Sequence, residues 1–165
     1  MGLDISVNVK VGEALEEIRS DWENELQKNE AIRILEEMDQ YEMLSTKTGS
    51  YAGLHVLRRE YARMKTWTDY SAGENLTPRH LASHLLNHSD CDGWYLPEKF
   101  DSPVWCKSDG DKYHVSIGSS YRLLEELCEM LACKDQWPED MQWRWDALFV
   151  VAIASCATRT PVEFH

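Results

Sequence analysis

The run from Ala147 to Ala157 constrains the fold more than any other feature of this sequence, because it is apolar on nearly all sides. Asp140 lies where a residue could cap a helix that contains the run. A helix without a polar face is normally buried. We therefore expect this helix at the centre of the fold, with the other elements packed around it.

Apolar spacing predicts the remaining elements. Residues 3–11 place Ile5, Val7 and Val9 on one face, as in a strand with one buried side. Extended segments at 104–106 and 113–117 could pair across a turn. Spacing of three and four residues predicts helices over 13–27, 30–44, 51–65, 77–88 and from Gly118 to the break at Trp137-Pro138.

These elements predict the fold class. We expect a single α+β domain over residues 1–165 that is mainly helical. Its sheet should be small and antiparallel, built from the N-terminal strand and the 94–117 region. The C-terminal helix should be buried, and residues 158–165 should form a tail.

The formal net charge is −12, which limits the classes of partner. Binding to nucleic-acid phosphates depends on Lys and Arg, so we exclude general nucleic-acid binding, and likewise binding to an anionic membrane. Residues 47–79 differ, with six basic and three acidic residues. This local basic patch could bind a small anion or an acidic partner, but we favour pairing with the acidic N-terminal helices.

The cysteines indicate the compartment. There are five, none lies in a CxxC motif, and the chain shows no signal peptide. An odd number of unpaired thiols is typical of a reduced environment. We expect a cytoplasmic protein with free thiols.

Three histidines suggest a metal site. His80, His84 and His88 are four residues apart, so on a helix they would border the apolar face. His84 and His88 could chelate a divalent metal with Asp90, and Asp92 could act as a base. HxxxH without an intervening Glu is frequent, so ordinary packing is the alternative, and no cofactor is certain.

The run His88–Pro97 holds an imidazole, a thiol, two carboxylates and two aromatic rings. Cys91 stands between Asp90 and Asp92, whose charges would raise the pKa of its thiol, so it is a poor nucleophile. Asp92-Gly93 is a turn dipeptide in any interpretation. The run therefore suits holding a ligand better than attacking one.

A second candidate site is the predicted helix start at Thr48-Gly49-Ser50-Tyr51. Free backbone N–H groups at a helix N-terminus favour an anion, and Arg58 lies two turns further along. Together the two candidates give one predicted ligand-binding set: Tyr51, Arg58, His84, His88, Asp90, Asp92 and Tyr95.

Several segments carry a resemblance to a known family. They are the Met1–Ile5 start, Gly49-Ser50-Tyr51, the His88–Pro97 run and Gly118-Ser119-Ser120. The chain resembles a family of uncharacterised bacterial and phage proteins that begin MGLDI and carry an HSDCDG(Y/W)Y-x-P segment. The resemblance implies a bacterial or phage origin, a cytosolic protein and a shared ligand site, and it carries over no catalytic residues.

Two functions follow from these observations. The first is a bacterial or phage binding protein that sequesters a small polar ligand or a protein partner. The second is a metal-dependent hydrolase that uses the site at residues 84–92. We favour the non-enzymatic function, and a purely structural role for the His88–Pro97 run stays open.

Overall fold

The computed structural model of the chain describes residues 3–38, 41–71, 76–88, 93–107 and 114–165. Its sheet has six strands in the order β2-β1-β6-β3-β5-β4. Strands β3 and β5 run parallel, and the other neighbours are antiparallel. The α+β architecture is present, but the prediction of a small antiparallel sheet is wrong. The strands are β1 (Leu3–Lys10), β2 (Met43–Gly49), β3 (Gly93–Leu96), β4 (Val104–Lys107), β5 (His114–Ser119) and β6 (Val162–Phe164).

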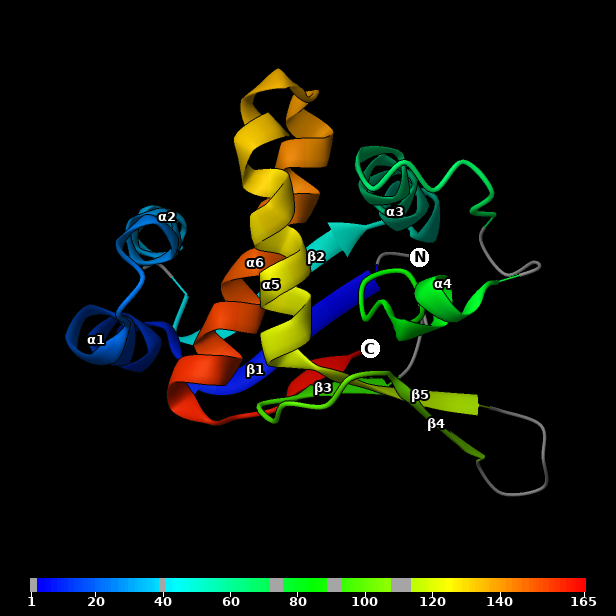
Figure 1. Ribbon diagram of the computed structural model, residues 1–165. Helices are drawn as coiled ribbons and strands as arrows, with labels where there is room; N and C mark the ends of the chain where they lie inside the picture. The colour runs from blue at the N-terminus through cyan, green and yellow to red at the C-terminus, as the bar shows by residue number, and fades with distance from the viewer. Residues whose placement is uncertain (1–2, 39–40, 72–75, 89–92, 108–113) are drawn as a thin grey trace.

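The helices gather on one face of this sheet (Figure 1). Alternation along β1 shows why, because Leu3, Ile5, Val7 and Val9 are buried while the residues between them are more exposed. The helices are α1 (Val11–Asp21), α2 (Glu25–Glu37), α3 (Tyr51–Met64), α4 (Pro78–Ala82), α5 (Ser120–Met130), the 3₁₀ helix η2 (Leu131–Gln136) and α6 (Glu139–Thr158).

Helix α6 lies at the centre, between the α1–α2 pair and α3 (Figure 1). Every residue from Ala147 to Cys156 is buried, as the apolar run predicts. Trp145 stacks on Phe149 and donates its indole N–H to the carbonyl of Leu127, which ties α6 to α5. The helix begins at Glu139 with Pro138 at the cap position, so the predicted capping by Asp140 is wrong. In the described part of the chain, every helix is too short or too polar to cross a membrane.

Strand β2 differs from the sequence prediction. The spacing predicts a helix over 30–44, but α2 ends at Glu37, and residues 43–49 form a strand that pairs with β1. Leu44 and Thr48 are its buried side chains. Two adjacent apolar residues followed by polar ones give no alternation, so only the pairing partner reveals this strand.

Strand β6 occupies residues that were expected to form a tail. Val162 and Phe164 are buried, and Glu163 between them is exposed. The strand lies between β1 and β3 and joins the two halves of the sheet. The prediction of a tail at 158–165 is therefore wrong. Three residues are too few to form a periodic pattern, so the sequence alone does not indicate this strand.

Candidate functional site

The segment that carries the three histidines is not one helix. The predicted start at Thr77-Pro78 is correct, but α4 ends at Ala82. The carboxylate of Glu126 on α5 accepts the backbone N–H groups of His84 and Leu85 at 3.1 and 2.6 Å. A helix would direct those N–H groups to carbonyls four residues earlier. The predicted helical stripe of histidines is therefore wrong.

The histidines occupy separate buried environments. His84 accepts the backbone N–H of Ser119 on Nδ1 at 2.8 Å, and its ring contacts Phe100 edge-on. Burial lowers the pKa of His84 to about 4, so it is neutral at pH 7. His88 stacks on Tyr95 with 4.1 Å between ring centroids, and its Nε2 lies 3.2 Å from the carbonyl oxygen of Trp94.

Arg58 joins these residues from α3. Its side chain is buried and donates to the carbonyl oxygens of Leu85 at 2.8 Å and His88 at 2.7 Å. The hydroxyl of Tyr95 donates to the carbonyl of His84 at 2.7 Å. The protein thus brings four predicted site residues together around residues 83–88, which we call the buried loop. These contacts hold the backbone of the loop.

The other predicted site residues lie elsewhere. Tyr51 is the first residue of α3 and packs against the core. Asp90 and Asp92 lie outside the described residues, as does Cys91. Within the described ranges no group of three or more His, Cys, Asp or Glu side chains could hold a metal ion. A binding role for the predicted set of residues stays a prediction.

The start of α3 is covered by the protein itself. Ser50 caps the helix by accepting the N–H of Gly53 at 3.2 Å. A Cβ atom on Gly53 would overlap the guanidinium of Arg144, and one on Gly49 would lie 3.2 Å from the ring of Trp143. Arg58 points away toward the buried loop. The two parts of the predicted anion site therefore do not converge.

A different feature stands out once the fold is known. Residues 11–42, which form α1, α2 and their flanking connections, hold 11 acidic and 3 basic residues. Their net charge of −8 is two thirds of the total of −12. We call this region the acidic layer. From the sequence we describe the N-terminal helices as acidic but predict no site there. The charge count along the chain was the available signal.

The acidic side chains of α1 are regularly spaced. Glu13, Glu17 and Asp21 are four residues apart, which places them about 6 Å apart along one side of the helix. Glu13 and Asp21 are exposed and Glu17 is half-buried. Among the ion pairs of the described residues, none involves these three carboxylates. Their charge is thus available to a partner.

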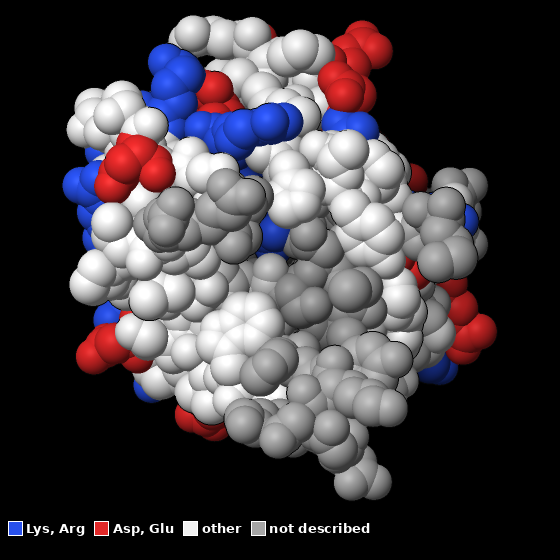
Figure 2. All heavy atoms as spheres, turned by 90° about the vertical axis from the view of Figure 1, so that its right-hand side faces the viewer, with Lys and Arg blue, Asp and Glu red and all other residues white. Residues whose placement is uncertain are grey.

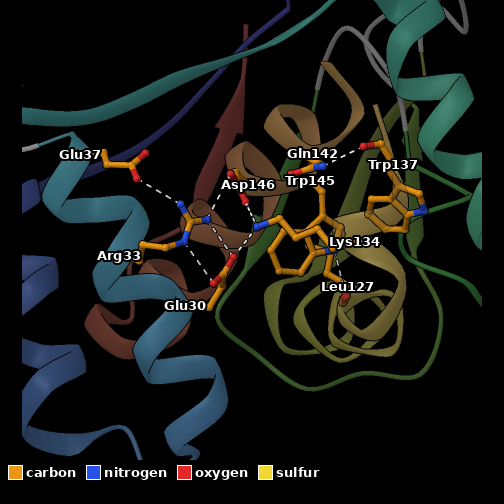
Figure 3. Close-up of polar contacts among 9 residues, drawn as sticks. All are labelled: Glu30, Arg33, Glu37, Leu127, Lys134, Trp137, Gln142, Trp145 and Asp146. Atoms are coloured by element: carbon orange, nitrogen blue, oxygen red, sulfur yellow. Dashed lines mark hydrogen bonds and ion pairs between the residues drawn. The ribbon is translucent and has the colours of Figure 1, made fainter. Parts of the chain in front are cut away.

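An ion-pair network holds α2 against the core (Figure 3). The ammonium of Lys134, on η2, contacts the carboxylates of Glu30 and Asp146, and it lies 4.5 Å from the ring centre of Trp145. Arg33 pairs with Glu30 at 2.9 Å and with Asp146 at 3.4 Å. Burial acts to raise the pKa of Glu30, but hydrogen bonds from the two cations outweigh it, and the pKa lies below its ordinary value.

The opposite side of the molecule differs in charge. Figure 2 shows the side of α3 and α4, where most described side chains are uncharged and acidic ones lie toward the rim. The basic residues of this region pair locally, Arg63 with Glu60, Lys65 with Glu129 and Arg79 with Asp69. We expected the basic residues of the 47–79 region to pair with the acidic N-terminal helices. No ion pair of the described residues joins the two regions.

Comparison with known proteins gives one match. The family model described as "Putative DNA-mimic protein" matches residues 1–164. No curated protein and no solved structure is similar enough to the chain to count as a match. A DNA-mimic family implies a protein partner that normally binds DNA, so the expectation of a small polar ligand is wrong. The MGLDI start and the HSDCDG segment, as marks of a family, stay a prediction.

Proposed function

Because the chain belongs to this DNA-mimic family, we propose that it binds the DNA-contacting surface of a DNA-binding protein and competes with DNA for it. The mode of action is sequestration, without a chemical step. A DNA-contacting surface is rich in Lys and Arg, because affinity for DNA depends on neutralising phosphates. A protein that competes for such a surface must itself present dense negative charge.

The acidic layer is the observation that carries this proposal. Helix α1 has four carboxylates in 11 residues. At a rise of about 1.5 Å per residue this is one carboxylate per about 4 Å. A single DNA strand carries one phosphate per about 3.4 Å along the axis. The linear charge density of α1 is thus close to that of a DNA strand, although Arg19 offsets part of it.

Rigidity of the acidic layer supports the same function. Lys134 and Arg33 connect α2 to η2 and α6 through Glu30 and Asp146 (Figure 3). A surface whose charges are already positioned loses less entropy on binding than a flexible one. A preformed acidic surface can therefore compete with DNA, whose phosphates are also held in place.

The test is displacement of DNA. A labelled duplex is bound to purified DNA-binding proteins of the helix-turn-helix, β-ribbon and minor-groove classes. Fluorescence anisotropy then reports whether the acidic protein releases the duplex. We expect release from at least one class, weakening as salt is raised. Failure to release DNA from any class at low salt would contradict the proposal.

Matched variants assign the effect to a surface. The variant Glu13→Gln, Glu17→Gln, Asp21→Asn removes three charges from α1, and we expect it to weaken displacement at least tenfold. A control variant with Glu98→Gln, Glu139→Gln and Glu163→Gln removes three exposed charges outside the acidic layer. Equal weakening by both variants would show that net charge, and not the acidic layer, is responsible.

A further inference from the structure

We propose that a groove between α2, β2 and α6 receives an arginine side chain of the partner. The inference rests on the proposed function for the class of partner, and it goes further by naming the side chain and its receptor. The groove has a volume of about 460 Å³. Its wall includes Glu37 at the end of α2 and Met38 after it, so it borders the acidic layer.

Two exposed aromatic rings lie at this groove. Tyr41 and Trp143 line it, and their exposed fractions are 53% and 45%. The Trp143 ring lies against Gly49, where an added Cβ would come within 3.2 Å of it, so β2 supports the ring. A partly exposed indole can bind a cation over its ring. Exposed aromatic residues are also typical of the residues that dominate binding energy at protein interfaces.

An exposed carboxylate favours a cation in the groove. Three carboxylates line it, those of Asp4, Glu37 and Asp146, together with the ammonium of Lys47. Asp146 already pairs with Lys134 and Arg33. Glu37 pairs with Arg33 through Oε1, and its side chain remains 70% exposed. The Oδ1 atom of Asp4 has no hydrogen bond among the described residues, but it is buried, and Lys47 stands 4.0 Å from it. A donor that enters the groove therefore finds the exposed carboxylate of Glu37, whose Oε2 atom takes part in no ion pair of the described residues.

Arginine fits this combination better than lysine. Its planar guanidinium can stack on an aromatic ring while its edge donates to a carboxylate, whereas an ammonium is a hydrated point charge. DNA-binding proteins present arginine because it also pairs with phosphates and with guanine. The groove would thus take a side chain that the partner normally directs at DNA.

The experiment compares two peptides of equal charge. Labelled hexa-arginine and hexa-lysine are titrated against the full chain at low salt, with anisotropy as the readout. We expect hexa-arginine to bind at least fivefold more tightly. Trp143→Ala should remove this preference and leave the affinity for hexa-lysine nearly unchanged. The control Trp94→Ala, at an exposed tryptophan outside the groove, should keep the preference.

A second variant guards against a folding defect. Tyr41→Ala changes a ring that is 53% exposed and should reduce the preference while circular dichroism stays the same as in the wild type. Equal binding of the two peptides, or a preference that survives both Trp143→Ala and Tyr41→Ala, would overturn the groove proposal.

The same titration separates the two proposals. The triple variant of α1 should weaken both peptides by the same factor, because it changes charge and leaves the groove intact. If both peptides bind equally well and the α1 variant weakens both, only the groove proposal fails. If neither peptide binds, or the α1 variant has no effect, attraction by the acidic layer is contradicted as well.

Discussion

The acidic layer and the buried loop are both rich in polar groups, but they use them in opposite ways. The acidic layer keeps carboxylates in water, where their charge reaches a partner. The buried loop removes polar groups from water and satisfies four of its backbone groups with Arg58 and Glu126. Buried polar groups cost free energy unless they are hydrogen-bonded, so the first region is suited to recognition and the second to holding the fold.

The pKa values of Glu126, which binds the buried loop, and Glu30, in the acidic layer, shift in opposite directions. Burial raises the pKa of Glu126 to about 7, against the effect of the N–H groups of Leu85 and His84. At Glu30, burial acts in the same direction, but Arg33 and Lys134 lower the pKa below its ordinary value. Cations nearby, rather than depth alone, decide which carboxylate stays ionised.

The largest effect on stability should come from Arg58→Met. The variant removes two charge-assisted hydrogen bonds to buried carbonyls, each contributing about 1.5–3 kcal/mol. We expect the free energy of unfolding to fall by about 4 kcal/mol, measured by urea denaturation with circular dichroism. The neighbouring residue Arg59 is exposed, and Arg59→Met should change the free energy of unfolding by less than about 0.5 kcal/mol. Similar values for both would show that Arg58 does not anchor the buried loop.

The next effect is a pH dependence at Glu126. Its pKa in the folded protein lies above its ordinary value of 4.5, so its contribution to stability is fully present below about pH 4.5 and is lost as the pH rises to about 7. The difference in unfolding free energy between wild type and Glu126→Gln should therefore fall by about 3 kcal/mol over that window.

The contribution of Glu30 to stability should change with pH in the opposite direction. Its lowered pKa means that its contribution is present above the ordinary value and is lost as the pH falls. The difference between wild type and Glu30→Gln should therefore grow with rising pH. Denaturation series at several pH values measure both slopes, and slopes of the same sign would contradict the contrast between the two regions.

A smaller effect is expected for Lys134→Met. The variant leaves Glu30 and Asp146 with Arg33 as a remaining partner, and the side chains of both are about one fifth exposed. We expect a loss of about 2 kcal/mol, less than for a fully buried pair. Arg122 forms exposed pairs with Asp101 and Glu125, so Arg122→Met should cost at most about 1 kcal/mol. Thermal unfolding ranks the two variants.

A small net effect on stability is expected for the α1 variant Glu13→Gln, Glu17→Gln, Asp21→Asn. Substitutions at such sites usually change the unfolding free energy by less than about 0.5 kcal/mol each, and relief of repulsion in a protein of net charge −12 acts in the stabilising direction. Strong loss of DNA displacement with little loss of stability would separate recognition from folding. A large loss of stability would show that α1 supports the fold.

Local patterns in the sequence determined several elements directly. The apolar run from Ala147 identified the buried helix α6, and the alternation after Leu3 identified β1. Ser119 caps α5 through the N–H of Arg122, one residue after the predicted helix start at Gly118. The pairing of β4 with β5 also followed from local spacing. In each case one segment carries enough periodic residues to fix its own conformation.

Only the tertiary structure decided the rest. Strands β2 and β6 exist because β1 and β3 provide their hydrogen bonds. The histidine segment leaves the helix because Glu126, about 40 residues away in the chain, takes its N–H groups. The acidic residues of α1 and α2 were visible as a count, but only the fold places them on one side, opposite α3 (Figure 1). Contacts between distant segments determine these features, and no local pattern in the sequence indicates them.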